Sequence, residues 1–301
     1  MPEPDRWIEE NIPDQSGKLF LVTGANSGLG YELSRALAHK GATVVMACRS
    51  PEKGEGAAAK IRGKNPKGEL RVMELDLADL SSVRKFAEGF RVEYGHLNVL
   101  VNNGGVMATP YARSADGFEL QFGTNHLGHF ALTGLLLDRL QATPGSRVVT
   151  VSSYAHWFGW INFRDLNGEK FYYRWLAYTQ SKLANLLFTY ELGRRLARAG
   201  GDPTSLAAHP GSTVTQLQQY TRMFAFVNGT IGHSPQMAAL PVLYAATRPE
   251  LRGGEYISPD GFLGQRGYPY VARSSPLSHN QALARRLWQV SEELTGVKYD
   301  I

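Results

Sequence analysis

The sequence has a single cysteine, Cys48, among its 301 residues. One thiol excludes an intramolecular disulfide and any metal site built from several cysteines. Cys48 ends the apolar run 42–48, where a buried and unreactive thiol is expected. His126, His129 and His209 have no second ligand at metal spacing, so we expect packed or hydrogen-bonded histidines and no bound metal.

The sequence also lacks a long hydrophobic run and a strong charge of one sign. No apolar stretch approaches the roughly 18 residues that span a bilayer, and residues 1–18 are too polar for a signal peptide or an anchor. The 32 Lys and Arg against 27 Asp and Glu give a net charge of +5, spread along the chain without the basic stripe of nucleic-acid-binding proteins. We therefore expect a cytoplasmic protein with a small-molecule partner, with no nucleic acid and no transmembrane segment.

Apolar runs of strand length alternate with helical stretches along the chain. The expected strands are 19–23, 43–48, 69–75, 98–102, 147–152, 205–208 and 254–257, and the expected helices are 28–40, 52–63, 81–94, 118–141, 178–199, 235–246 and 280–294. Strands joined by crossover helices form a parallel sheet with both faces covered. The sequence thus predicts an α/β fold with one doubly wound Rossmann-type domain and a seven-stranded parallel sheet. An N-terminal extension (1–17) and a C-terminal tail (about 259–301) flank it.

A glycine-rich turn, Thr23-Gly24-Ala25-Asn26-Ser27-Gly28-Leu29-Gly30, joins the first strand to the first helix. Glycines let the backbone approach a pyrophosphate, which the helix N-terminus holds with free amides. A plain turn is the alternative, but the place between strand and helix favours nucleotide binding. The expected contacts of the nucleotide are Gly24, Asn26, Ser27, Gly28, Leu29 and Gly30.

Arg49 ends the second strand, at the place that faces the 2′ position of the adenosine ribose in a Rossmann unit. An acidic residue there would accept hydrogen bonds from the NAD hydroxyls. Arg49 instead offers a planar cationic fork to a 2′-phosphate. A solvated surface arginine is the alternative. We therefore predict NADP(H) in preference to NAD(H).

The ends of the third and fourth strands carry small or polar residues, where such sheets bind ligands. Asp76 offers an acceptor to the adenine amino group, although N-capping of the next helix is its alternative. Gly104 and Gly105 leave room for the adenosine half of the cofactor. The expected contacts here are Asp76, Leu77, Asn103, Gly104 and Gly105.

Tyr178 and Lys182 lie four residues apart on a predicted helix, and hence on the same face. A free tyrosine has a pKa of about 10, and a nearby lysine cation is expected to lower it toward useful values. Ser153 follows the fifth strand beside the cleft, where its hydroxyl could polarise a carbonyl. A serine that caps a loop is the alternative. Asn125 lies mid-helix and either anchors a water near the lysine or is an ordinary polar residue.

Together these motifs resemble the short-chain dehydrogenase/reductase (SDR) family from about Lys18 to Ile257. The motifs, in order, are Thr23-Gly24…Gly28-Leu29-Gly30, Asp76, Asn102-Asn103-Gly104-Gly105, Asn125, Ser152-Ser153, Tyr178…Lys182 and Pro210-Gly211. The family's catalytic tetrad falls on Asn125, Ser153, Tyr178 and Lys182. The resemblance implies that Tyr178 protonates a carbonyl oxygen, Ser153 polarises it, and Asn125 completes a proton relay.

The resemblance also implies further contacts of the cofactor. Lys182 is expected to hold the nicotinamide ribose, and Tyr178 to lie beside it. The segment 210–215 resembles the one that lies against the nicotinamide, with contacts from Pro210, Gly211, Thr213 and Thr215. Residues 216–234 are expected to form a flap over the site. The resemblance further implies a homodimer or homotetramer through the helices 118–141 and 178–199.

Two features depart from the common family pattern. Gly104 stands where alanine is usual, which should loosen the local packing. Tyr178 follows Ser153 by 25 residues (178 − 153), about twice the usual gap, and the insert is rich in aromatic residues. This insert is similar to that of the retinol dehydrogenase and protochlorophyllide reductase branch, which handles bulky lipophilic substrates. Aromatic rings beside a cleft bury large apolar ligands, and rings that only pack a loop are the alternative.

The sequence therefore predicts an NADP(H)-dependent oxidoreductase, a carbonyl reductase or alcohol dehydrogenase. Its substrate is expected to be a lipophilic or bulky aldehyde, ketone or secondary alcohol. The alternative is a non-catalytic NAD(P)-binding regulator on the same fold, which would have no need of all four tetrad residues. A sugar epimerase or dehydratase would show another glycine spacing and a longer C-terminal domain.

Overall fold

The computed structural model describes residues 6–211 and 234–301, which form one α/β domain around an eight-stranded sheet. The strand order is β3-β2-β1-β4-β5-β6-β7-β8. The strands are β1 (Leu19–Thr23), β2 (Thr43–Cys48), β3 (Leu70–Glu74), β4 (Val99–Asn102), β5 (Arg147–Val151), β6 (Thr204–Ala208), β7 (Tyr256–Pro259) and β8 (Pro269–Ala272). The strand order reverses between β1 and β4, and such a switch point opens a crevice at the carboxyl ends of the strands.

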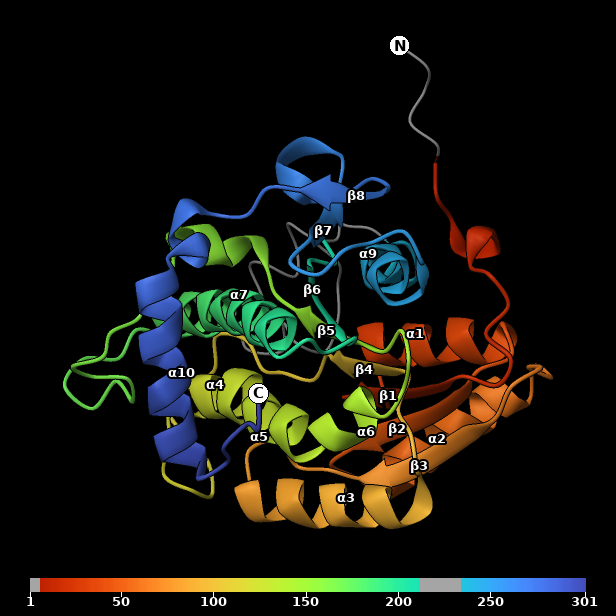
Figure 1. Cartoon of the computed structure of the whole chain (residues 1–301), viewed down its shortest axis with the longest axis horizontal. Coiled ribbons are helices and arrows are strands. Elements are labelled where there is room, and N and C mark those ends of the chain that lie inside the picture. The colour runs from red at the N-terminus through yellow and green to blue at the C-terminus, as the bar shows by residue number, and fades with distance from the viewer. Residues whose placement is uncertain (1–5, 212–233) are drawn as a thin grey trace.

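Helices cover both faces of the sheet, as the sequence predicts (Figure 1). One face carries α1 (Gly28–His39), α2 (Pro51–Arg62) and α9 (Pro235–Thr247). The other carries α3 (Leu80–Glu93), α5 (Gly128–Leu135) and α7 (Arg174–Arg198). Alternate residues of a strand point to opposite faces. Phe20 of β1 therefore enters the core beneath α1 and α9, while Leu21 enters the core beneath α3 and α5.

The expected seven-stranded parallel sheet is wrong by one strand. Strands β1 to β7 are parallel, and β8 returns antiparallel along β7, with Ile257 opposite Val271. The four-residue β8 begins with a proline and follows a glycine-rich stretch, so its sequence resembles a loop. Proline lacks the N–H of a central strand but is tolerated at a sheet edge, which is where β8 lies.

The single helix expected over 118–141 is divided in the structure. It consists of α4 (Leu120–Phe122), a π-helical turn (Gly123–Leu127), α5 and α6 (Leu137–Gln141). Helix α7 begins at Arg174, four residues earlier than expected. The π turn contains Asn125, so this residue lies in an irregular segment of the helical region. Turns of this type occur frequently at functional sites.

Residues near both ends of the described part of the chain take part in the folded domain. Trp7 and Ile12 of the N-terminal extension are buried in the core beneath α1 and α9. The expected C-terminal tail contains β8 and α10 (Gln281–Thr295), and α10 packs against α7 and α5. These are the helices that the resemblance implies as a subunit interface, and residues of this chain cover part of them. Trp288 and Tyr299 are buried there against Phe130.

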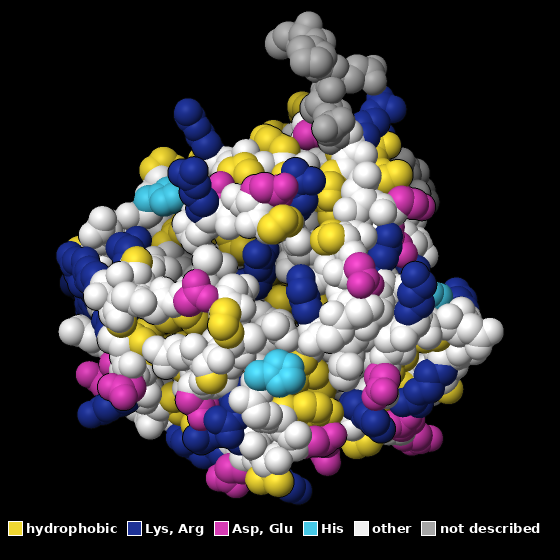
Figure 2. All heavy atoms as spheres, turned by 45° about the vertical axis from the view of Figure 1, so that its right-hand side comes forward, with side chains coloured by type: hydrophobic (Ala, Val, Ile, Leu, Met, Phe, Trp, Pro, Cys, Tyr) yellow, Lys and Arg dark blue, Asp and Glu magenta, His cyan; other side chains and the backbone are white. Residues whose placement is uncertain are grey.

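The described ranges hold no candidate membrane-spanning helix and no candidate metal-binding cluster. None of the helices within 6–211 and 234–301 is long and apolar enough to cross a bilayer. In the same ranges, no three His, Cys, Asp or Glu side chains are close enough to hold a metal ion. On the face in Figure 2, Lys and Arg side chains alternate with Asp and Glu rather than forming a stripe.

Candidate active site

The glycine turn after β1 is a tightly packed backbone cradle. Gly24 and Gly28 have φ angles of +64° and +54°, in the left-handed region that favours glycine. A Cβ at Gly30 would overlap the carbonyl oxygen of Gly24, so only glycine fits there. Ser27 is the N-cap residue of α1 but makes no capping hydrogen bond with its side chain. The first amides of α1 and the Ser27 hydroxyl are therefore suited to bind an anion.

Thr23, at the end of β1, holds this cradle against the loop after β4. Its Oγ1 accepts hydrogen bonds from the backbone N–H groups of Asn103 (2.9 Å) and Gly104 (2.8 Å). Asn103 Nδ2 donates to the Thr23 carbonyl at 2.7 Å. His129 Nε2 lies 2.9 Å from the same Thr23 hydroxyl. The supporting role of His129 was not predicted, because nothing in the sequence places α5 beneath β1.

The residues expected near the adenosine lie at the carboxyl ends of β2, β3 and β4. Arg49 is exposed directly after β2. Asp76 Oδ1 accepts from the Ala78 N–H at 2.9 Å, while Asp79 caps α3, so the N-capping alternative for Asp76 is wrong.

The glycine at position 104 does not leave a loosely packed site. A Cβ on Gly104 would lie 2.7 Å from Leu77 Cδ1, so the Leu77 side chain occupies the space that an alanine methyl would need. The expected loosening is therefore not found. Leu77 itself is 8% exposed, which fits a packing role at the edge of the cradle.

Ser153 and Tyr178 meet above the carboxyl end of β5. The Ser153 hydroxyl lies close enough to the Tyr178 phenol to lower its pKa, and Tyr178 is buried at 7% exposure. Ser153 also accepts from the Ala155 N–H at 3.3 Å as the N-cap of a 3-10 turn (Tyr154–Phe158), so the capping role and the contact with Tyr178 coexist. The neighbouring Ser152 instead donates to the Lys182 carbonyl at 2.8 Å. Of the two serines, Ser153 is thus the one that touches Tyr178.

Burial dominates the protonation of Tyr178 and Lys182. It raises the pKa of Tyr178 to about 12, against the opposing effect of the hydrogen bond to Ser153. It lowers the pKa of Lys182 to about 8, and Lys182 Nζ donates to the Val151 carbonyl at 3.3 Å. We expected the lysine cation to lower the pKa of Tyr178. That expectation is wrong, because removal of the phenol from water has the larger effect on its pKa.

Asn125 connects the loop after β4 to α7. Its Oδ1 accepts from the Val106 N–H (2.8 Å), and its Nδ2 donates to the Val106 carbonyl (2.9 Å) and to Ser181 Oγ (3.0 Å). Both polar atoms of the amide are therefore occupied by hydrogen bonds. This differs from the expected arrangement, in which the amide faces Lys182 and anchors a water. A Cβ at Gly105 would lie 2.8 Å from Asn125 Oδ1 and 3.9 Å from Lys182 Nζ. Gly105 thus lets these two side chains approach the loop.

The histidines singled out in the sequence are buried side chains. His126 Nε2 lies 2.9 Å from Ser291 Oγ of α10, and His129 Nδ1 lies 3.0 Å from the Asn125 carbonyl oxygen. Burial lowers the pKa of His126 and His209 to about 3 and that of His129 to about 4. These rings are therefore neutral at pH 7, and the packed interpretation is confirmed for His126 and His129.

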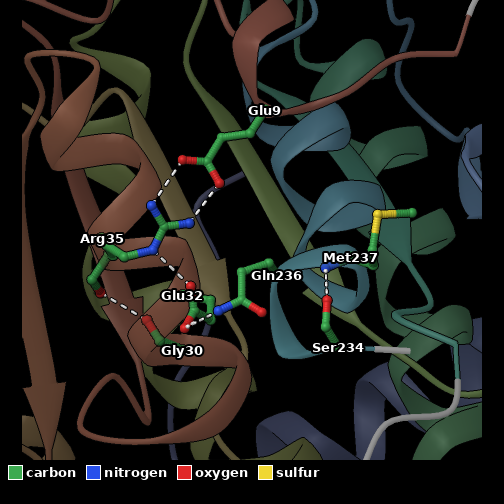
Figure 3. A network of polar contacts seen from close by, with 8 residues as sticks. Glu9, Gly30, Glu32, Arg35, Ser234, Gln236 and Met237 are labelled. Carbon is green, nitrogen blue, oxygen red and sulfur yellow. Dashed lines mark hydrogen bonds and ion pairs between the residues drawn. The ribbon is translucent and has the colours of Figure 1, made fainter. Parts of the chain in front are cut away.

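An ion-pair network fixes α1, the helix that presents the glycine cradle (Figure 3). Arg35 of α1 donates to both carboxylate oxygens of Glu9 in the N-terminal extension, at 2.9 and 2.5 Å. It also donates to Glu32 at 2.7 Å, and Gln236 of α9 donates to the other oxygen of Glu32 at 3.2 Å. The network joins three segments that are far apart in the sequence, so no local sequence pattern predicts it.

The segment expected beside the nicotinamide is described only in part. Pro210 and Gly211 follow β6, and Gly211 has a φ angle of +80°. Thr213 and Thr215 lie outside the described residues, as does most of the expected flap 216–234.

The aromatic insert between Ser153 and Tyr178 divides into packed and exposed rings. Tyr172 packs the insert onto the domain, since its hydroxyl donates to the Thr109 carbonyl at 2.8 Å and its ring meets that of Tyr111. Trp157 and Phe158, in the turn directly after Ser153, are 42% and 66% exposed. The packing interpretation of the insert thus holds for Tyr172. Trp157 and Phe158 instead leave apolar surface exposed in the turn that Ser153 caps.

Comparison of the chain with known proteins identifies its family. The family model described as short chain dehydrogenase matches residues 18–224. Human retinol dehydrogenase 11 is 45% identical to this chain over 291 residues, which cover 94% of this chain and 87% of that protein. Human retinol dehydrogenase 13 is 42% identical over 294 residues, which cover 94% of this chain and 86% of that protein.

Solved structures agree with this result. The crystal structure of an uncharacterized protein from Mycobacterium Paratuberculosis is 46% identical, with a TM-score of 0.84 over 98% of this chain and 99% of that chain. The Pseudomonas aeruginosa RhlG/NADP active-site complex shares the fold at 21% identity, with a TM-score of 0.62 over 80% and 94% of the two chains. The chain therefore belongs to the short-chain dehydrogenase family, on its retinol dehydrogenase branch, and is an oxidoreductase of alcohol and carbonyl groups.

Proposed function

We propose that this oxidoreductase uses NADP(H) to interconvert a lipophilic aldehyde or ketone with its alcohol. The observation that carries the proposal is the contact between Ser153 and Tyr178, with Lys182 one turn further along α7. A non-catalytic regulator on this fold would not require these groups to meet. The assembled site favours the enzyme over that alternative.

When bound, NADPH would supply the hydride that reduces the carbonyl carbon of the substrate. Tyr178 donates its phenolic proton to the carbonyl oxygen, and its raised pKa keeps that proton in place at neutral pH. The Ser153 hydroxyl donates a hydrogen bond to the same oxygen and stabilises the negative charge that develops there. Lys182 stabilises the phenolate that remains and binds the nicotinamide ribose. Asn125 holds the loop after β4 beside Lys182 through its two hydrogen bonds with the Val106 backbone.

The residues of the cradle fit a dinucleotide, because the places where a Cβ would intrude are occupied by glycine. We assign Gly24, Asn26, Ser27, Gly28, Leu29 and Gly30 to the pyrophosphate side, Asp76, Leu77, Asn103, Gly104 and Gly105 to the adenosine side, and Pro210, Gly211, Thr213 and Thr215 to the nicotinamide side. Arg49 is the group proposed for the 2′-phosphate.

A lipophilic substrate is proposed from the relatives and from the exposed rings in and beside the turn Tyr154–Phe158 that Ser153 caps, which we call the catalytic turn. Trp157, Phe158 and Trp160 offer apolar surface within a few residues of Ser153. The relatives are named for retinol, a bulky lipophilic alcohol. Retinal, its aldehyde, is therefore a suitable probe substrate. The cytoplasmic location and the homodimer or homotetramer stay predictions from the sequence.

The test begins with fluorescence titration of the purified protein with NADPH and with NADH. We expect tighter binding of NADPH, and Arg49→Ala should remove most of that preference while leaving NADH binding unchanged. Arg71→Ala is the matched control, because Arg71 is an exposed arginine of β3 whose ion pair with Glu69 lies away from the carboxyl edge of the sheet. Equal affinity for the two cofactors would sink the role of Arg49. Absence of NADPH-dependent retinal reduction in a protein that binds NADPH would favour the regulator.

A further inference from the structure

One buried histidine holds the catalytic turn but plays no part in the chemistry described above. His156 lies in the 3-10 turn that Ser153 caps and is 1% exposed. Its Nδ1 lies 2.6 Å from the Ser153 carbonyl oxygen, which also accepts from the His156 backbone N–H at 3.0 Å. The ring thus adds a second hydrogen bond to the backbone of the serine that touches Tyr178.

The other ring nitrogen of His156 binds the C-terminal part of the chain. Nε2 accepts from the backbone N–H of Ser275 at 3.0 Å, across 119 residues of sequence. A peptide N–H can only donate and a carbonyl can only accept, so the two contacts fix a neutral ring with its proton on Nδ1. Burial lowers the pKa of His156 to about 4, which keeps the ring neutral at pH 7.

The segment that carries Ser275 is itself attached to α7. Ser274 Oγ lies 2.6 Å from the hydroxyl of Tyr190, and the His279 ring stacks on the Tyr190 ring with centroids 4.5 Å apart. Tyr190 is on the same helix as Tyr178. His156 therefore connects the turn that carries Ser153 to a segment mounted on the helix that carries Tyr178.

The position of Ser153 depends on this connection, because the turn has little rigidity of its own. The turn has five residues, and only the 3.3 Å contact from Ala155 holds the serine hydroxyl from within it. Short 3-10 turns have poor hydrogen-bond geometry. A fixed Ser153 carbonyl restricts the backbone from which the hydroxyl projects toward Tyr178.

We propose that His156 is a positioning residue, whose Nδ1–H holds the Ser153 backbone so that the hydroxyl stays aligned with Tyr178. The proposal rests on the proposed reduction of carbonyl groups. A displacement of a catalytic group by about 1 Å can reduce the rate about 100-fold, so a contact outside the reacting atoms can control turnover.

Two substitutions separate the two contacts of the ring. In His156→Asn, the side-chain amide nitrogen replaces Nδ1 as a donor to the Ser153 carbonyl, and the contact with Ser275 is lost. In His156→Gln, the longer side chain places an acceptor near Nε2 and leaves the Ser153 carbonyl without its ring donor. We expect kcat for retinal reduction to fall about 100-fold in His156→Gln, with NADPH affinity unchanged. His156→Asn should keep most of kcat.

The same substitution in a Ser153→Ala background distinguishes positioning from general loss of structure. If His156 acts through Ser153, His156→Gln causes no further loss of kcat once the serine hydroxyl is absent. Equal loss in both backgrounds would overturn the proposal, as would equal loss of kcat in the Asn and Gln variants.

A measurement that needs no turnover completes the test. Nitrogen-15 NMR of the histidine rings in the wild-type protein should show His156 with its proton on Nδ1. A proton on Nε2 would overturn the proposal even in an inactive protein. Absence of NADPH-dependent reduction in the wild type would instead contradict the proposed function. The position of the ring proton would then still test whether His156 holds the Ser153 backbone.

Discussion

Lys182 Nζ lies 5.7 Å from the centroid of the Tyr178 ring, one turn along α7, and both side chains are buried. Burial disfavours the charged form of each, so the pKa of the phenol rises to about 12 and that of the ammonium falls to about 8. A phenolate formed at Tyr178 would have the Lys182 ammonium as its neighbouring cation in a site of low dielectric. This relationship supports the proposed roles of Tyr178 as the proton donor and of Lys182 as the group that stabilises its conjugate base.

Tyr178→Phe removes the proton donor and keeps the ring. We expect kcat for retinal reduction to fall by roughly 10²- to 10⁴-fold, the contribution that a positioned acid typically makes. NADPH affinity should stay close to that of the wild type, because the cradle after β1 is untouched. Steady-state kinetics and fluorescence titration measure the two quantities.

Tyr94→Phe is the matched control, since Tyr94 is the C-cap residue of α3, remote from the catalytic turn, and also has a raised pKa. It should leave kcat unchanged. A Tyr178→Phe protein with near-normal turnover would remove Tyr178 from the proposed mechanism.

Part of this site follows from the sequence because parallel strands end at one edge of the sheet. Ser153 follows β5, and Asn103 follows the neighbouring β4. The residues that follow each predicted strand were therefore expected to lie at the same edge of the sheet as the glycine cradle. The i, i+4 spacing of Tyr178 and Lys182 likewise places both on one face of any helix.

Other features carry no signal in the local sequence. A π turn and an α-helix have similar hydrophobic periodicity, so the irregular segment around Asn125 was predicted as continuous helix. The contact between His156 and Ser275 spans 119 residues and depends on tertiary packing alone. The pKa of Tyr178 depends on its burial, which spacing along a helix does not reveal.

Acid should destabilise the protein before its carboxylates are protonated, because four histidines are buried as neutral rings. Burial lowers the pKa of His126 and His209 to about 3 and that of His129 and His156 to about 4. An unfolded histidine has a pKa of about 6.5. Between about pH 6.5 and 4 the unfolded chain therefore binds more protons, so the free energy of unfolding falls as the pH falls.

Four such groups change the free energy of unfolding by on the order of 5 kcal/mol per pH unit at the steepest point. Urea unfolding at pH 7, 6 and 5 measures this slope. In His126→Asn the slope should be smaller by the contribution of one proton, about 1.4 kcal/mol per pH unit at most. His96→Gln, at an exposed position, controls for the loss of a histidine. A slope equal to that of the wild type in His126→Asn would show that His126 does not contribute.

The Glu9–Arg35–Glu32 network should stabilise the domain more than any exposed ion pair. The side chains of Arg35 and Glu32 are only 14% and 9% exposed, so Arg35→Ala leaves the Glu32 carboxylate buried without its cation. Loss of one partner from a buried pair reduces the free energy of unfolding by roughly 3–5 kcal/mol, and a value near the lower end is expected for this partly exposed site. Arg71→Ala breaks an ion pair between side chains that are 59% and 65% exposed, and should change the free energy of unfolding by less than about 1 kcal/mol.

Urea unfolding of the two variants gives the comparison. The double variant Arg35→Ala/Glu32→Gln should recover part of the loss, because no unpaired charge remains at position 32. Equal effects of Arg35→Ala and Arg71→Ala would mean that the network contributes no more than a surface pair. Weaker NADPH binding in Arg35→Ala, with the fold intact, would show that the network also positions α1 and its glycine cradle.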